Sequence, residues 1–246
     1  MTFGEHLEEL RKRVMISVIV IGVLFFACFF LHDQTLRVFI SPFERVRANL
    51  LEEGIEIGPL TFIDPTESFT FALKVALYSA LILGGPVCLY EMWAFIAAGL
   101  HQRERRAVMK VLPVSLGLFS IGVLFCYFLV VPIALEFLLS FAPHDQIQAD
   151  IRLETYLSFI TMLCLLMGGI FQLPLLQVVV ARFGLLSAKS QREKRKAFIM
   201  AAVVVCAIVT PTGDALTLIL VAGPMLILYE LGLIAAGRVK ARPQEG

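Results

Sequence analysis

The chain has 246 residues, of which 59% are hydrophobic and only 17% are charged. Soluble domains contain about 45–50% apolar residues, and a water-soluble enzyme or nucleic-acid-binding protein could not bury this much apolar surface. The formal net charge of +1, from 21 basic and 20 acidic residues, gives no signal for nucleic-acid binding. Together with a mean hydropathy of +0.85, the composition predicts an integral membrane protein.

Six stretches of the chain carry few or no charges and are long enough to cross a membrane. A helix needs about 20 residues to span a hydrocarbon core of about 30 Å, and in hydrocarbon its backbone groups must pair within the helix. We therefore predict an all-α membrane protein that forms a single transmembrane domain over residues 1–246. The six predicted transmembrane helices cover approximately residues 14–32, 69–90, 111–135, 155–181, 197–210 and 215–237.

Prolines lie within or beside most of these spans, among them Pro86 and Pro174. An interior proline removes a backbone hydrogen bond and kinks a helix. Pro211 is expected to end the fifth span early, and only a few residues separate that span from the sixth. We therefore predict a bent, dished bundle in which the last two spans are short.

The segment between the first two spans, residues 33–68, is long and amphipathic. Its apolar residues recur at helical spacing, with an interruption at Pro42. We predict that this segment folds as short helices that cap the outer face of the bundle. An exposed apolar stripe of this kind is alternatively a docking surface.

The positions of Lys and Arg predict the orientation of the protein. If the N-terminus is cytoplasmic, the inner segments carry 16 of the 21 basic residues and the outer segments carry four, while Lys74 lies within a span. Cytoplasmic loops show such an excess, so both termini are predicted to face the cytoplasm.

The first span is too long for the core of a cleaved signal peptide and no transit peptide precedes it. These features favour a multi-pass protein of a prokaryotic (inner) cell membrane.

No catalytic apparatus is visible in the sequence. The five cysteines all fall within predicted spans, without a C-x-x-C pair or a Cys/His cluster at metal-ligand spacing. The HExxH, GxSxG and GxGxxG motifs are also missing. We therefore expect a protein that is not an enzyme and that uses no metal or cofactor.

Three polar side chains inside the predicted spans are candidates for function: Lys74, Gln172 and Glu230. The Lys74 amine can reach the outer interface, whereas Glu230 falls in the inner half of the bilayer. Gln172 falls near the middle, where its amide can bond a neighbouring helix. A small-solute transporter or channel, the alternative function, would need such groups to converge and usually has an internal repeat, which the two halves do not show. An intramembrane hydrolase would need a paired nucleophile and base, which are missing.

Several motifs, taken in order, resemble those of the TatC family, the signal-peptide receptors of twin-arginine protein translocases. The resemblance covers approximately residues 3–237, and the order and spacing of the motifs are more specific than any one of them. The matching stretches are residues 5–13 (EHLEELRKR), 41–43 (SPF), 64–69 (DPTESF), 85–96 (GPVCLYEMWAFI), 101–106 (HQRERR), 171–174 (FQLP), Thr210-Pro211 with Asp214, and Pro224 leading to Tyr229-Glu230.

The resemblance implies a receptor and core subunit that binds twin-arginine signal peptides at the cytoplasmic face. It also implies export of folded proteins driven by the proton-motive force, in an oligomeric assembly with single-span partners of the TatA and TatB type. Carried over position by position, the peptide-binding acids are Glu9 and Glu104, with Phe95 beside them.

The remaining residues singled out by the resemblance fall into two groups. The polar residues expected to face partners or the membrane interior are Gln172, Glu230 and Asp214, and the residues with structural roles are Pro42, Pro86 and Pro174. Three features depart from the family pattern: Gln172 where a glutamate is frequent, Ala98 where a proline is common, and a corner at residues 210–214 that is one residue longer.

The two predicted peptide-binding acids differ in their neighbours. Glu9 has Arg13 four residues further on, the spacing of a helical ion pair worth about 0.3–0.5 kcal/mol. Glu104 has apolar residues at the corresponding helical positions and three arginines close to it in the sequence. We therefore predict that the Glu104 carboxylate is ionised, has no helical partner and is the stronger of the two binding candidates.

Overall fold

The computed structural model describes residues 3–61, 67–99, 102–140, 151–184, 186–209 and 214–238. Within these ranges the chain is mainly helical, and a single isolated β-bridge joins Thr61 to Arg152. The elements are α1 (Phe3–Phe30), α2 (His32–Glu52), α3 (Glu67–Ala98), α4 (Gln102–Phe125), the π-helical turn η1 (Cys126–Val130), α5 (Val131–Ser140), α6 (Leu153–Ile170), α7 (Leu173–Arg182), α8 (Ala188–Glu193), α9 (Arg195–Val209) and α10 (Ala215–Gly237).

Five helical segments of the described chain are long and apolar enough to cross a membrane. They are Gly4–Phe30, Phe69–Ala98, Val108–Ser140, Leu153–Arg182 and Ala215–Gly237, which correspond to five of the six predicted spans. The remaining prediction, residues 197–210, falls on α9, whose 15 residues reach about 22 Å at 1.5 Å per residue. This helix is shorter than the hydrocarbon core, so a sixth full span stays a prediction.

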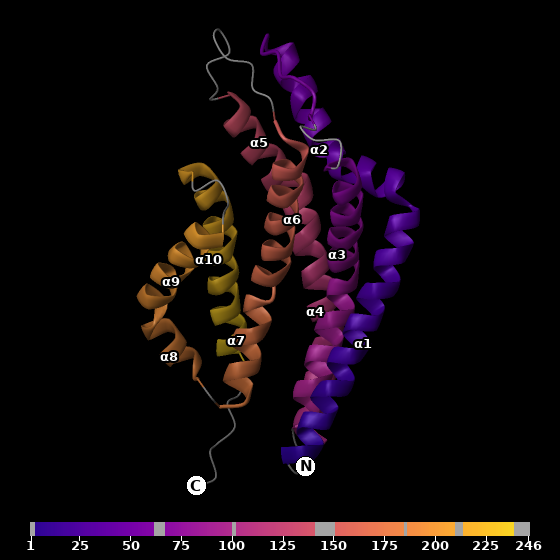
Figure 1. The fold of residues 1–246 in the computed structure, drawn as a ribbon. Coiled ribbons are helices and arrows are strands. Elements are labelled where there is room, and N and C mark those ends of the chain that lie inside the picture. Colours follow the sequence, from indigo (N-terminus) through magenta and orange to yellow (C-terminus); the bar gives the residue numbers. More distant parts are fainter. Residues whose placement is uncertain are drawn as a thin grey trace.

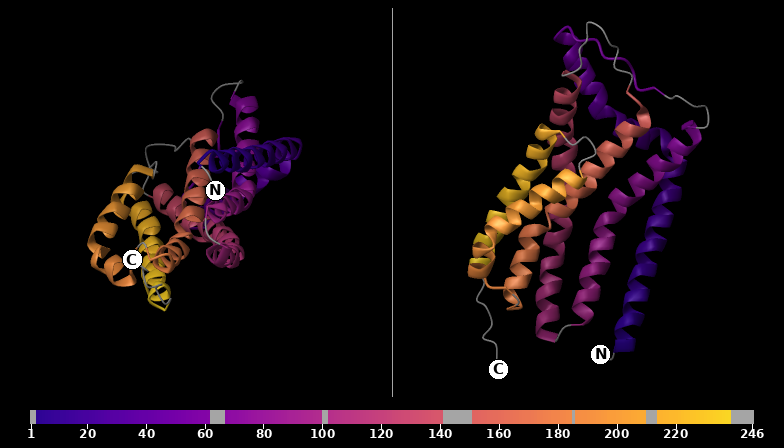
Figure 2. Two further views of the ribbon diagram at one scale, coloured as in Figure 1. Left: turned by 90° about the horizontal axis from the view of Figure 1, so that it is seen from below. Right: turned by 60° about the vertical axis from the view of Figure 1, so that its left-hand side comes forward.

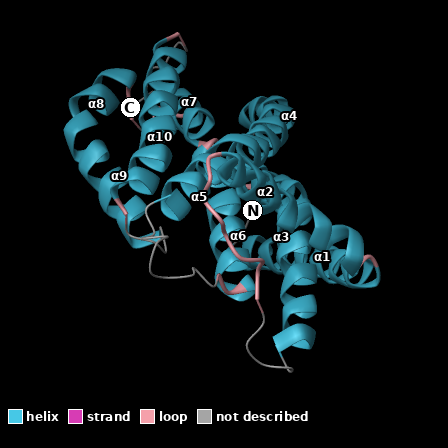
Figure 3. Ribbon diagram, turned by 90° about the horizontal axis from the view of Figure 1, so that it is seen from above, coloured by secondary structure: helices cyan, strands magenta, loops and turns pink. Residues whose placement is uncertain are grey.

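The helices are arranged as a curved row (Figures 1 and 3). α1 packs along α3, α3 packs on α4, and α4 packs on α6. At the other side of the molecule, α7 and α9 both pack on α10. Only 6% of the most apolar stretch of α1 is buried, against 50% in the α6–α7 segment. α6 is therefore the centre of the packing, and α1 turns most of its apolar surface outward.

The two ends of the row differ in what they carry (Figure 2). One end of the molecule contains the start of α1, the end of α3, the start of α4 and the ends of α7 and α10. The other end contains α2 and α5. Neighbouring long helices joined by short connections run antiparallel. The first and last helices thus begin and end on the same side, while the identity of that side as cytoplasmic stays a prediction.

The segment after α1 differs from the prediction of short helices interrupted at Pro42. It forms one helix of 21 residues, α2, with Pro42 buried inside it. Proline cannot donate to the carbonyl four residues earlier, which belongs to Val38. The Tyr127 hydroxyl donates a hydrogen bond of 2.6 Å to this Val38 oxygen. A tertiary contact therefore supplies the missing donor, and the helix continues through the proline.

Packing and backbone contacts hold α2 and its C-terminal extension against the bundle. The apolar stripe of α2, including Phe43 at 0% exposure, joins the main core with α5 and α6. The Tyr156 hydroxyl donates to the Phe39 oxygen at 2.6 Å. Further along, the Thr61 backbone pairs with residues 151 and 153 at the start of α6. The segment is therefore helical and packed on the bundle, while its position at the outer face of the membrane stays a prediction.

Prolines interrupt two of the spans in different ways. Ahead of Pro132, the third span passes through η1, where the Val131 N–H bonds to the Cys126 oxygen five residues earlier. The fourth span breaks between α6 and α7, with Gln172 as the N-cap residue of α7 and Pro174 in its first turn. Pro86 and Pro224, by contrast, lie inside continuous helices. A proline therefore accompanies a break in the α-helix in the third and fourth spans but not at Pro86 or Pro224.

Close contact between α3, α4 and α6 depends on two glycines. A Cβ at Gly85 or at Gly168 would overlap the ring of Phe119. The phenylalanine of α4 can lie between α3 and α6 only because both positions lack a side chain, as in other tightly packed membrane helices.

Candidate functional site

An arginine with two carboxylates joins α1 to α3 near the end of the molecule where α1 begins. The Arg13 Nε and Nη2 atoms lie 2.8 and 2.7 Å from Oε1 of Glu9, one turn earlier in α1. The Nη1 atom of the same guanidinium lies 2.8 Å from Oε2 of Glu91 in α3. Arg13 therefore joins a carboxylate of its own helix to one that is 78 residues away in the sequence.

Burial makes this cluster different from an ordinary surface ion pair. The side-chain exposures are 23% for Arg13, 20% for Glu9 and 8% for Glu91. A carboxylate as buried as Glu91 needs a cation with good hydrogen-bond geometry. The cluster contains two carboxyl groups and one guanidinium, so it has one acid more than it has bases.

Phe95 extends the site by one turn of α3 beyond Glu91. Its ring stacks on His6 of α1, with ring centroids 4.5 Å apart and an interplanar angle of 23°. His6 and Glu9 are one turn apart on α1, so the stacked pair and the ion pair follow each other along one helix–helix contact. The phenyl ring is half-buried and offers an apolar wall beside the charges.

Glu104 lies in the first turn of α4, and its side chain is outside the part of the chain that the structure describes. Its helix starts just after the α3–α4 junction, at the same end of the molecule as the start of α1 (Figure 1). The structure therefore brings Glu9 and Phe95 onto two packed helices and places the Glu104 backbone at the same end. That its carboxylate is free stays a prediction.

Glu91 was not among the residues predicted from the sequence. The ion pair of Glu9 with Arg13 could be anticipated from their spacing, whereas the contact of Arg13 with Glu91 is made only when α1 packs on α3. One signal was available: Glu91 is the first acid after an apolar run, at the predicted inner end of the second span. An acid at such a depth needs a partner, and Arg13 ends the charged segment before the first span.

Gln172 belongs to a second polar cluster, which is neutral and internal. The Trp93 indole N–H donates to Ser115 Oγ at 2.9 Å, and the Ser115 hydroxyl donates to Gln172 Oε1 at 2.6 Å. The Gln172 amide donates in turn to the Ser115 backbone oxygen at 3.1 Å. These bonds join α3, α4 and the break between α6 and α7, so Gln172 has partners within its own chain.

The other predicted polar residues have partners different from those of Gln172. Glu230 forms an ion pair of 2.7 Å with Arg195 at the start of α9, and both side chains are partly exposed. Asp214 is the N-cap of α10 and accepts from the Thr217 N–H at 2.7 Å, about 24 Å along the helix axis from Glu230. Lys74 pairs with Glu154 at the start of α6.

Comparison with known proteins identifies the family of the chain. Residues 5–224 match the family described as Sec-independent protein translocase protein (TatC). The chain belongs to the TatC family. A TatC protein of Carboxydothermus hydrogenoformans is 32% identical over 246 residues, covering 100% of this chain and 97% of the relative. A TatC protein of Desulforapulum autotrophicum is 36% identical over 234 residues, covering 95% and 83% of the two chains.

Solved structures support the same assignment. The chain is similar to the crystal structure of the twin-arginine translocase receptor TatC, with a TM-score of 0.78 and 31% identity over 94% of this chain and 97% of that one. The predicted TatC resemblance and the all-helical membrane fold are confirmed. Membership of the TatC family makes this chain a protein of Sec-independent protein translocation, which disfavours small-solute transport.

The internal polar groups of this TatC family member agree with that conclusion. Gln172 bonds Ser115, Glu230 pairs with Arg195 and Lys74 pairs with Glu154, whereas a solute pathway requires such groups to converge. Within the described residues, no group of three or more His, Cys, Asp and Glu side chains is arranged to hold a metal ion. The chemistry of the site is therefore that of guanidinium and carboxylate groups.

Proposed function

We propose that the chain is the receptor and core subunit of a twin-arginine translocase, and that it binds twin-arginine signal peptides at the end where α1 begins. In this proposal that end faces the cytoplasm of a prokaryotic cell, and the assembly exports folded proteins at the expense of the proton-motive force. Its partners are single-span membrane proteins of the TatA and TatB type.

The observation that carries the proposal is the guanidinium already bound in the cluster. Arg13 shows that Glu9 can hold an arginine in a two-contact arrangement beside a second acid. Both of these contacts end on Oε1 of Glu9, which leaves Oε2 available to a second donor. Because the cluster carries one more acid than base, an additional arginine from a peptide would balance its charge.

A site built from carboxylates also explains selectivity for arginine over lysine. A guanidinium is planar and offers a fork of donors that matches a carboxylate, whereas an ammonium is a compact point charge. Two consecutive arginines need two acids, and Glu104 at the start of α4 is the second. Phe95 provides an apolar surface for the residues that follow the arginines.

The partner surface in this proposal lies on the outward-facing helices. α1 exposes apolar side chains such as Val18, Val23 and Phe26, which suit contact with another membrane helix or with lipid. Polar contacts with a partner would involve Glu230, whose side chain is partly exposed, more readily than Gln172, whose amide is bonded internally.

Crosslinking of a photoreactive twin-arginine signal peptide to the full-length protein in membranes tests the proposal. Glu9→Gln and Glu104→Gln remove a charge without changing size, and each should lower peptide affinity about 10- to 100-fold, since a hydrogen bond to a charged group contributes about 1.5–3 kcal/mol. Glu8→Gln, at an exposed neighbour on the same helix, is the matched control and should leave crosslinking unchanged.

A twin-lysine version of the same peptide should bind weakly to every variant. The proposal is contradicted if crosslinking is unchanged in both Glu9→Gln and Glu104→Gln, or if the twin-lysine and twin-arginine peptides bind equally. Either result would show that these acids do not recognise the twin-arginine motif. Copurification of the TatA- and TatB-type partners with each variant separates a binding defect from a failure of assembly.

A further inference from the structure

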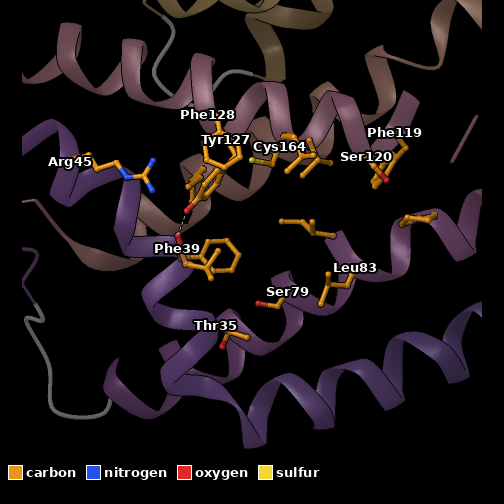
Figure 4. Close-up of a pocket in the computed structure, with 16 residues that line it drawn as sticks. Thr35, Phe39, Arg45, Ser79, Leu83, Phe119, Ser120, Tyr127, Phe128 and Cys164 are labelled. Carbon is orange, nitrogen blue, oxygen red and sulfur yellow. Dashed lines mark hydrogen bonds between the residues drawn. The ribbon is translucent and has the colours of Figure 1, made fainter. Parts of the chain in front are cut away.

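A large cavity opens between α2, α3, α4 with η1, and α6, well away from the α1–α3 site (Figure 4). Its volume of about 650 Å³ lies within the range of about 300–1,000 Å³ that is typical of ligand pockets. Most of its wall is aliphatic or aromatic, and this wall lies at the level of the predicted spans. The occupant must therefore be mainly apolar.

Most polar groups in the cavity wall are already bonded to nearby backbone. The Thr35 hydroxyl donates to the His32 oxygen at 2.9 Å, and the Ser120 hydroxyl donates to the Leu116 oxygen at 3.1 Å. Tyr127 donates to Val38, as described above. These side chains present little unsatisfied polarity to an occupant.

Ser79 is different, because its hydroxyl oxygen is buried and has no hydrogen-bond partner. The residue is 5% exposed and lines the cavity between its two ends (Figure 4). A buried hydroxyl without a partner is costly, and here it lies beside an empty volume. The simplest solution is an acceptor, such as an ester carbonyl, on the molecule that occupies the cavity.

Arg45 lies at one end of the cavity, with its guanidinium on the side of Tyr127 (Figure 4). It is exposed and has no ion-pair or hydrogen-bond partner within the described chain, whereas its neighbours Glu44 and Arg47 pair with each other at 3.8 Å. An unpaired guanidinium at the mouth of an apolar cavity matches an anionic head group on an apolar tail.

We propose that this cavity binds one glycerophospholipid. Its phosphate pairs with Arg45, an ester carbonyl accepts from the Ser79 hydroxyl, and an acyl chain lies along the apolar wall that includes Leu83 and Phe119. The order of the groups along the cavity, cation, then hydroxyl, then hydrocarbon, is the order of phosphate, ester and chain in the lipid. A lipid in this position also fills a void that would otherwise weaken the packing of α2 on the bundle.

Photolabelling tests the proposal with the full-length protein reconstituted in vesicles. The probe is phosphatidylglycerol with a photoreactive group on one acyl chain, in a background of unlabelled phosphatidylcholine. Labelling should map by mass spectrometry to the cavity wall, and Arg45→Gln should reduce it about tenfold, the loss expected for a charge-assisted hydrogen bond. Arg45→Lys should recover part of the labelling.

Arg37→Gln is the matched control, because Arg37 is also exposed on α2 but does not line the cavity. Its labelling should equal that of the unaltered protein. Diacylglycerol with the same photoreactive chain lacks the phosphate and should label the cavity wall weakly. Ser79→Ala should reduce labelling to a smaller extent than Arg45→Gln.

The proposal is overturned if Arg45→Gln is labelled as strongly as the unaltered protein, or if Arg37→Gln loses labelling equally, which would indicate nonspecific annular lipid. Equal labelling by diacylglycerol, or a crosslink from the cavity to a partner protein in place of lipid, would also overturn it. Arg45→Gln should keep normal crosslinking to a twin-arginine peptide, so this inference and the proposed receptor function can fail separately.

Discussion

Two polar clusters depend on residues of α3 that are two positions apart, and they differ in kind. Glu91 faces α1, where it shares Arg13 with Glu9, while Trp93 faces α4, where it donates to Ser115 in contact with Gln172. The first cluster is charged, has one acid in excess and is partly exposed. The second cluster is neutral, and the Trp93, Ser115 and Gln172 side chains each donate to an acceptor within it.

This difference separates a binding site from a structural contact. A neutral network whose groups are satisfied internally rigidifies the fold and offers little to a ligand. A cluster with an excess carboxylate and partial exposure can accept another cation without a large rearrangement. Gln172 lies within the closed network and therefore joins α4 to the break between α6 and α7. The Glu9–Glu91 pair is the better candidate for recognition of an arginine.

The largest effect should come from removing the cation that both acids share. Arg13→Gln leaves the carboxylate of Glu91 buried without a counter-charge, and such a loss costs about 3–5 kcal/mol. Thermal unfolding in detergent should show a clear drop in stability. The double variant Arg13→Gln with Glu91→Gln should recover most of the lost stability, because the buried charge is also removed. An unaltered midpoint of thermal unfolding in Arg13→Gln alone would show that the ion pair does not stabilise the fold.

A smaller loss of stability should follow when a hydrogen-bonding group is removed from the neutral network of Trp93, Ser115 and Gln172. Ser115→Ala deprives both the Trp93 indole N–H and the Gln172 carbonyl of a partner, at a cost of about 1–3 kcal/mol. Peptide crosslinking should be unchanged, in contrast to the Glu9 and Glu104 variants. Ser120→Ala on the same helix, whose hydroxyl bonds only its own backbone, is the control; a peptide-binding defect in Ser115→Ala would contradict the division between the two clusters.

The smallest effect is expected when the Gln172 amide is replaced by a carboxyl group. In the apolar interior the carboxyl group of Gln172→Glu is neutral, keeps an oxygen that can accept from the Ser115 hydroxyl and exchanges the amide donor for an O–H, a change of about 1 kcal/mol. Transport of a twin-arginine precursor should therefore stay active. Gln172→Leu removes both bonds and should lower the midpoint of thermal unfolding while partner crosslinking is unchanged. Loss of partner crosslinking at an unchanged midpoint would contradict the internal role of this residue.

Much of the architecture could be predicted from local patterns. The apolar runs at 69–90 and 215–237 correspond to α3 and α10. In hydrocarbon the backbone groups must form their hydrogen bonds within the helix, so an apolar run of sufficient length predicts a spanning helix. The pair of Glu9 with Arg13 follows from a spacing of four residues, whereas the N-cap role of Asp214 was not predicted.

Other features depend on residues that are distant in the sequence. Pro42 predicts a helix break when considered locally, yet α2 continues because Tyr127, from η1, donates to the carbonyl that the proline cannot serve. Likewise, Glu91 appears as an isolated acid until α1 packs against α3 and supplies Arg13. Neither contact could be deduced from spacing, since the partners are 89 and 78 residues apart.

The amino-acid sequence by itself determined that this is a helical membrane protein with the motifs of the TatC family, because composition, apolar length and short-range spacing are local properties. Only the tertiary structure decided which polar groups are satisfied and which remain available. It closed Gln172 into a network with Ser115, left Glu9 with an oxygen to spare, and left Arg45 and the Ser79 hydroxyl facing an apolar cavity. Hydrogen bonds and ion pairs in a membrane are made between neighbouring helices, and the identity of those neighbours is a property of the packed fold.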